Sequence, residues 1–162
     1  MRIKGVLKMS TEFNLVTLKA MRLVFLYGSG QNRESAQQNA FDQMNVYLSS
    51  QNELLDTEKY FLTMHFSQGG KTQYNFILYA KVSDHAVEQK PVKIINSPEA
   101  LFMHTKLHGD IDTLNGKEFL QEVQDYHKTH DLRSDPKYFL ALATPVDLDA
   151  KEIDYYLPVK HK

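Results

Sequence analysis

Hydrophobic residues recur every three or four positions in two segments of the chain, and this spacing predicts two amphipathic helices. The first helix is expected to follow a capping residue, Asn32 or Ser35, and to end near residues 50–52. Its apolar stripe consists of Ala36, Ala40, Phe41, Met44, Tyr47 and Leu48. The second is expected from about Leu114 to Thr129, with a stripe of Phe119, Leu120, Val123, Tyr126 and His127.

Shorter segments rich in aromatic and branched residues predict strands, because such side chains fit a pleated, half-buried surface. In the first half of the chain these segments are residues 21–27, 59–66 and 72–82. The pair Gly69-Gly70 separates the last two and predicts a hairpin. In the second half the strand segments are residues 92–95, 100–107, 138–143 and 153–159. A turn is expected at His108-Gly109-Asp110.

The two halves therefore repeat one order of elements: strand, helix, strand, strand. Lys59-Tyr60-Phe61-Leu62 recurs 78 positions later (137 − 59) as Lys137-Tyr138-Phe139-Leu140, and the same offset aligns Phe41 with Phe119. Neither half alone buries both its helix stripe and its sheet. We expect an α+β fold of two duplicated β-α-β-β modules with antiparallel sheets, two main helices packed on one side, and a pseudo-twofold axis.

The expected organisation is a single domain over residues 15–162. Module one covers about 15–83, a polar linker covers 84–91 and ends at a proline, and module two covers about 92–162. Residues 1–14 are expected to form a flexible extension, and Met9 resembles a start residue as much as Met1 does.

Composition narrows the classes of partner. The chain has 19 basic and 20 acidic residues, so no broad electrostatic attraction draws it to nucleic acid or anionic lipid. It has no cysteine, and therefore no disulfide and no thiolate chemistry. No run of about 20 apolar residues predicts a membrane span, and no apolar signal segment follows the start. We expect a cytoplasmic protein with no nucleic-acid partner.

The residues that carry most chemistry form no complete set in the sequence. His104 and His108 are expected on a strand and its turn, and His127 and His130 at a helix end, so no three ligands converge on a metal ion. Ser29 lies between two glycines without an adjacent base. Glu118 and Glu122, four positions apart, predict a solvated helix face. We expect no metal, no cofactor and no enzymatic activity.

Several short segments carry a family resemblance. They are Ala100-Leu101-Phe102, His108-Gly109, Leu114, Pro136-Lys137-Tyr138 and the closing Asp154-Tyr155-Tyr156-Leu157-Pro158-Val159. In this order they resemble the GyrI-like family, the effector-binding domains of multidrug-responsive bacterial regulators and their free-standing relatives in Gram-positive bacteria. The resemblance covers about residues 15–160. It implies a non-catalytic domain that binds or senses a hydrophobic or amphipathic small molecule in a pocket between the two modules.

The resemblance, combined with strand alternation, predicts the residues that face this pocket. Phe139 and Ala141 share one face of their strand, and Asp154 and Tyr156 share one face of the next. The internal repeat adds Phe61, Thr63 and Leu78 as counterparts, and His108 is a candidate donor from the turn or else a surface residue.

One position departs from the family. The resemblance implies a glutamate for cationic ligands on the strand of residues 138–142, and Phe139 stands at that position. A buried carboxylate is what attracts a cation, so a neutral apolar ligand is favoured here. The alternative function is a protein interaction module or adaptor of the same fold whose pocket is filled and holds no small molecule.

Overall fold

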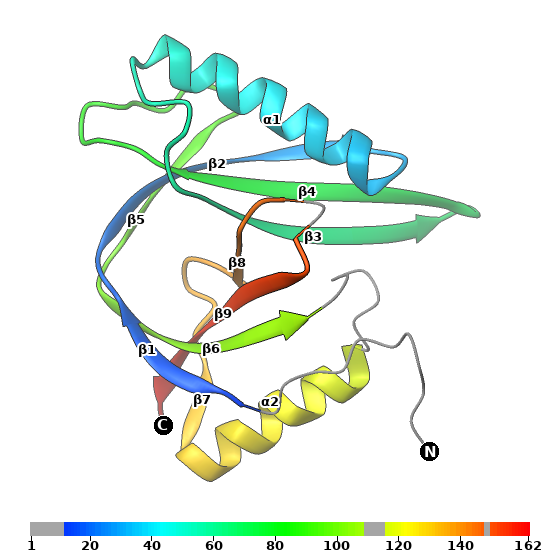
Figure 1. Ribbon diagram of the computed structural model, residues 1–162, viewed down its shortest axis with the longest axis vertical. Helices are drawn as coiled ribbons and strands as arrows, with labels where there is room; N and C mark the ends of the chain where they lie inside the picture. Colours follow the sequence, from blue (N-terminus) through cyan, green and yellow to red (C-terminus); the bar gives the residue numbers. More distant parts are fainter. Residues whose placement is uncertain (1–11, 109–115, 148–149) are drawn as a thin grey trace. The chain divides into compact units, whose positions relative to one another are not determined.

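The computed structural model describes residues 12–108, 116–147 and 150–162, in which there are two helices and nine strands. The chain forms two compact units. The α1 unit is Lys19–Pro98, and the α2 unit is Met1–Leu18 together with Glu99–Lys162. In each unit a single helix lies on one face of an antiparallel sheet (Figure 1). This is the α+β class that the sequence predicts.

The α1 unit contains β2 (Met21–Gly30), α1 (Arg33–Ser50), β3 (Lys59–Gln68), β4 (Lys71–Lys81) and β5 (Lys93–Ser97). Its strands lie in the order β3-β4-β2-β5, and every neighbouring pair is antiparallel. Gly69 and Gly70 join β3 to β4 with φ values of 59° and 78°. Both lie in the left-handed region that a two-residue hairpin requires and that glycine adopts without strain.

Helix α1 begins as the sequence predicts. The Asn32 side chain accepts a hydrogen bond from the Ser35 N–H, and the Ser35 side chain bonds back to the Asn32 backbone. Five of the six predicted stripe residues are buried, and Phe41 is half-buried. The helix lies very close to β2, because a Cβ on Gly28 would stand 2.3 Å from the Ala36 carbonyl oxygen. Only glycine permits this approach.

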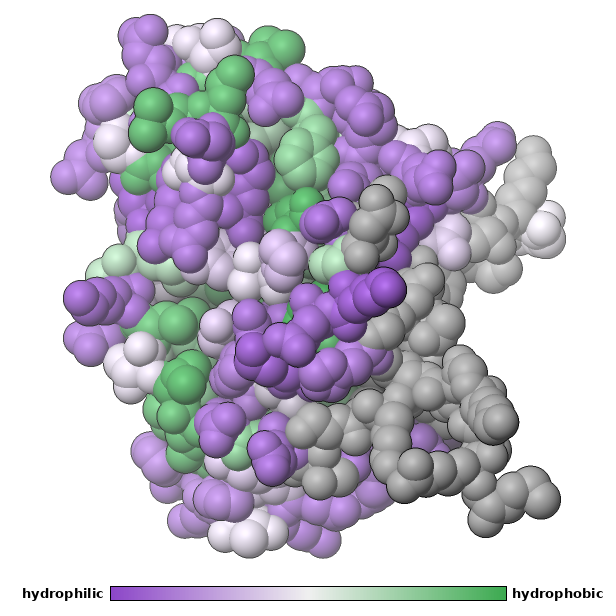
Figure 2. Space-filling view, viewed as in Figure 1, coloured by the Kyte–Doolittle hydropathy of each residue, from purple (hydrophilic) through white to green (hydrophobic). Residues whose placement is uncertain are grey.

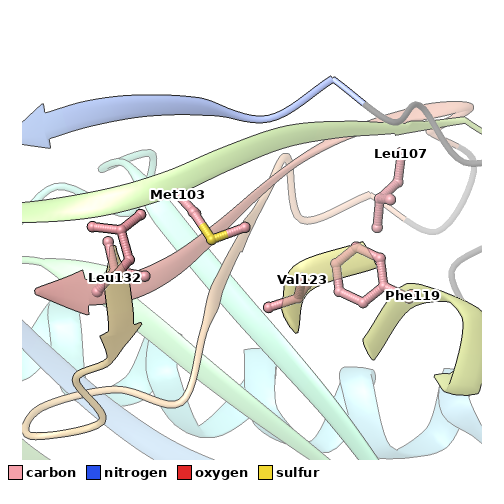
Figure 3. Close-up of a cluster of buried hydrophobic side chains, with 6 residues drawn as sticks. Met103, Leu107, Phe119, Val123 and Leu132 are labelled. Carbon is pink, nitrogen blue, oxygen red and sulfur yellow. The ribbon is translucent and has the colours of Figure 1, made fainter. Parts of the chain in front are cut away.

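The α2 unit contains β1 (Asn14–Leu18), β6 (Ala100–His108), α2 (Gly116–His130), β7 (Leu132–Ser134), β8 (Leu142–Thr144) and β9 (Glu152–His161). The order is β1-β6-β9-β8, and β7 pairs with the end of β9. Its core is a cluster of buried residues from β6, α2, β7 and β9: Met103, Leu107, Phe119, Val123, Leu132 and Val159 (Figure 3). Phe119 and Val123 from the predicted helix stripe pack into it.

The edge strand of each unit comes just before the first long strand of the other unit in the sequence. Strand β1 leads into β2 of the α1 unit but pairs with β6, and β5 leads into β6 of the α2 unit but pairs with β2. The strand orders β3-β4-β2-β5 and β8-β9-β6-β1 are therefore equivalent. The unit boundaries lie at Leu18–Lys19 and Pro98–Glu99, and not at residues 83 and 92.

Three local expectations change with the structure. Residues 84–91 belong to the α1 unit, where Arg22 donates hydrogen bonds to the carbonyls of Ser83 and Ala86. Phe13 and Asn14 are part of the α2 unit, not of a flexible extension, and residues 1–11 lie outside the described residues. The strand expected at residues 138–143 is reduced to Leu142–Thr144. The expected turn at Gly109 and Asp110 also falls outside the described residues.

A membrane-spanning helix is not found in the described part of the chain, since neither helix has the required apolar length.

Candidate functional site

The face of the α2-unit sheet that points away from α2 gathers aromatic and polar side chains. Strand register sets Phe102 opposite Pro158 and His104 opposite Tyr156, so these residues share one face. Met103 and Leu107, which alternate with them along β6, pack against α2 on the other face. We call Phe102, His104, Phe139, Asp154 and Tyr156 the aromatic face.

The rings of this face contact one another around Phe102. The centroid of Phe102 lies 6.2 Å from that of Phe139 and 6.4 Å from that of Tyr156, the second pair edge to face. His104 lies with its ring centroid 4.9 Å from Tyr156. Phe102 and Phe139 are buried, whereas Tyr156 and His104 are half-buried. Aromatic rings in mutual contact are typical of the walls of sites that bind apolar or aromatic molecules.

A row of hydrogen-bonded polar side chains borders the rings. The His104 Nε2 lies 2.8 Å from the Asp154 Oδ1, and these side chains are 15% and 34% exposed. Next along the strands, the Lys106 Nζ lies 2.8 Å from a Glu152 oxygen. Hydrogen bonding to Lys106 lowers the pKa of Glu152, and the same bond raises the pKa of Lys106. The carboxylate nearest the rings, Asp154, is therefore already partnered.

The structure brings together three of the eight predicted site residues: Phe139, Tyr156 and Asp154. His108 lies on the same face of β6 as His104, but it is more than half exposed and lies 3.5 Å from Glu152. Ala141 is buried and precedes β8, so strand alternation does not relate it to Phe139. Ligand contact by any of these residues stays a prediction.

The other three predicted residues, Phe61, Thr63 and Leu78, lie on the face of the α1-unit sheet that α1 covers. Phe61 is opposite Leu78, and Thr63 is opposite Phe76, which is opposite Gly28 beneath α1. Phe61 and Phe76 stack with centroids 5.4 Å apart. Phe61 and Leu78 are buried core residues and Thr63 is half-buried, so the repeat offset of 78 pairs residues on the helix-covered face of one sheet with Phe139 and Tyr156 on the aromatic face of the other. The strand of the α2 unit that corresponds to β3 is β8, and β8 begins at Leu142, after Phe139.

The uncovered face of the α1-unit sheet carries aromatic residues that the sequence analysis missed. Phe25 has its centroid 6.1 Å from Tyr27 and 5.8 Å from Tyr79, and Tyr60 lies opposite Tyr79. Burial, with a smaller effect of Tyr27, raises the pKa of Tyr79 to about 12. The alternation of Phe25 and Tyr27 was the signal for this face.

Ser83, His85 and Glu53 form a cluster with the composition of a catalytic triad. The Ser83 Oγ lies 2.7 Å from the His85 Nδ1, but the Glu53 Oε1 accepts hydrogen bonds from both the N–H and the Oγ of Ser83 at 2.6 Å. In a triad the acid orients the histidine, whereas here it binds the hydroxyl. The arrangement ties the loop after β4 to Glu53, which follows α1.

Within the described ranges, no three His, Asp or Glu side chains are placed to hold a metal ion.

Comparisons with known proteins support the fold. No family model matches the chain, and no curated protein matches it. The solved C-terminal domain of EcmrR has a TM-score of 0.56 at 10% identity, covering 93% of this chain and 98% of that one. EcmrR in a DNA complex has a TM-score of 0.61 at 9% identity, covering 93% and 58%.

A hydrolase encoded by lin2189 from Listeria innocua has a TM-score of 0.54 at 12% identity, covering 94% and 93%. At these identities the likeness establishes a shared α+β fold. It does not transfer an activity.

Proposed function

We propose that this protein binds an amphipathic small molecule on the aromatic face and acts as a non-catalytic effector-binding domain. The observation that carries the proposal is the contact of the Phe102, Phe139 and Tyr156 rings beside the His104–Asp154 pair. The family resemblance of the sequence implies an effector-binding role, and the fold shared with the EcmrR C-terminal domain is compatible with that resemblance. The expected location of the pocket, between the modules, stays a prediction.

The charges of the face favour an uncharged ligand. A cation is best held by a carboxylate that has no other partner, but the Asp154 carboxylate already makes a hydrogen bond with His104. Phe139 stands where the family resemblance implies a glutamate. A planar neutral molecule gains ring contacts with Phe102 and Phe139 and need not displace the hydrogen bond between His104 and Asp154.

The polar groups of the face support binding without chemistry. In the described part of the chain His104 bonds to Asp154 but to no hydroxyl, so it has no nucleophile to activate. The Ser83 hydroxyl is bound directly by Glu53. The hydrolase from Listeria innocua shares the fold, but a shared fold does not carry an activity with it.

A second candidate function, binding of a protein partner, is favoured by exposed apolar side chains of the α1 unit. Val46 is 73% exposed, Leu54 is 72% exposed and Val87 is 59% exposed. A hydrogen bond from the Val87 N–H to Gln51 holds Val87 at the C-terminal end of α1. Hydrophobic side chains gather there, at the upper left of Figure 2. Exposed apolar groups of this kind mark interaction sites.

A thermal-shift screen with a matched pair of variants tests the first proposal. The panel contains planar neutral aromatics and their cationic analogues, and a ligand of the folded state raises the melting temperature by mass action. We expect shifts from neutral members that disappear in Phe139→Leu and persist in Phe61→Leu, since Phe61 lies under α1. Shifts lost equally in both variants, or given only by cations, would contradict the proposal.

A further inference from the structure

A cavity of about 310 Å³ lies beside α2, on the side of the α2-unit sheet opposite to the aromatic face. Phe13, just before β1, forms one wall, and the other lining residues all come from α2: Glu122, Asp125, Tyr126, Thr129 and His130. Glu122, Tyr126 and His130 follow one another at intervals of four, so they form a line along the helix surface. The volume suits a small organic molecule.

The walls of the cavity are aromatic and fixed. Phe13 has its ring centroid 5.3 Å from Tyr126 and 6.3 Å from the buried Phe119, which anchors it to the core. On the other side, His130 stacks on Tyr126 with centroids 3.8 Å apart. Ring faces of this kind attract cations as well as apolar groups.

The polar atoms along the cavity are hydrogen-bond acceptors. The Thr129 hydroxyl donates to the Asp125 carbonyl, which leaves its oxygen as an acceptor. The His130 Nδ1 lies 3.0 Å from the Tyr126 carbonyl, so it carries the proton and Nε2 accepts in the neutral ring. The Asp125 carboxylate accepts a hydrogen bond from the Gln121 side-chain amide.

One of these acceptors, the Glu122 carboxylate, has an oxygen atom that receives no hydrogen bond. Its Oε2 is buried and has no hydrogen-bond partner. Burial, with repulsion from Glu118 and Asp125, raises the pKa of Glu122. A buried carboxylate oxygen without a donor is costly, and a bound donor with positive charge removes that cost. The face that the sequence predicts as solvated is thus partly buried.

We propose that this cavity binds a small organic cation with a flat or apolar body and several N–H donors, such as an amidinium or guanidinium. The N–H groups of the cation meet Glu122 and Asp125, and its body lies against the rings of Phe13 and Tyr126 that line the cavity. The site is separate from the aromatic face and takes ligands of opposite character. Whether this cavity binds a cation is therefore independent of whether the aromatic face binds a small molecule.

Calorimetric titration of the full chain with benzamidine and with benzamide tests the proposal, because the two molecules share a shape and differ in charge. We expect benzamidine to bind at least about tenfold more tightly than benzamide, the range for a charge-assisted hydrogen bond. Glu122→Gln should remove most of this difference. Glu118→Gln, which makes the same change of charge one turn away and off the cavity, should keep it.

Equal affinities for the two probes, or equal losses in Glu122→Gln and Glu118→Gln, would overturn the proposal. Tyr126→Leu gives a second test that leaves every carboxylate in place, and it should weaken benzamidine without reversing the preference over benzamide. Phe139→Leu should leave benzamidine binding unchanged, so a failure at the aromatic face is distinguishable from a failure here.

Discussion

The burial of Tyr79 is expected to lower the stability of the folded protein as the pH rises into the alkaline range. The residue lies on the face of the α1-unit sheet that α1 does not cover, and it is 5% exposed. Burial, and to a smaller extent Tyr27, raises its pKa from 10.0 to about 12. In the unfolded chain the hydroxyl ionises near its ordinary value.

The sign of the effect follows from linkage. Between pH 10 and 12 the folded protein keeps the Tyr79 proton while the unfolded chain loses it, so stability falls as the pH rises. The contribution is complete below about pH 10 and is lost as the pH passes through the folded pKa. A rise of about 2 pH units, at about 1.36 kcal/mol each, corresponds to about 2.7 kcal/mol.

Urea unfolding of the wild type and Tyr79→Phe at about pH 8 and about pH 11.5 measures this contribution. Between these values the wild type should lose about 2 kcal/mol more of its unfolding free energy than Tyr79→Phe does. Tyr138→Phe removes an exposed hydroxyl and should decline in parallel with the wild type. A parallel decline of Tyr79→Phe and the wild type would refute the reasoning.

Two further substitutions test the packing of the α1 unit. Gly28→Ala should lower the unfolding free energy by about 3 kcal/mol in urea denaturation, because the new Cβ meets the Ala36 backbone; Gly70→Ala, at a φ of 78° with open space, should cost only about 1 kcal/mol. Similar losses in the two glycine variants would contradict this account. Arg22→Lys should speed proteolysis within residues 83–92, since lysine does not reproduce the hydrogen bonds of the guanidinium to Ser83 and Ala86. An unchanged cleavage rate would show that these bonds do not hold the loop.

Local patterns in the sequence predict the elements well, because their causes are local. The cap at Asn32, the buried stripe of α1 and the Gly69-Gly70 hairpin each depend on residues within a few positions of one another. The repeated order of strand, helix, strand and strand also occurs in both units, with the short β7 added after the helix of the α2 unit.

Local sequence patterns do not predict which strands pair when those strands lie far apart in the sequence. The exchange of β1 and β5 between units depends on which edge each strand joins, and a run of apolar residues does not encode that choice. A shift of one residue in the repeat moves Phe61 from one sheet face to the other, because side chains alternate along a strand. The cavity beside Glu122 needs Phe13, which lies more than a hundred positions away in the sequence.

The aromatic face is tested most directly by a crystal structure of the protein with the best neutral aromatic ligand from the thermal-shift screen. The account predicts ligand density in contact with the rings of Phe102, Phe139 and Tyr156, with the His104–Asp154 pair intact beside it. Ligand density at another site, with those three rings packed only against protein, would contradict it.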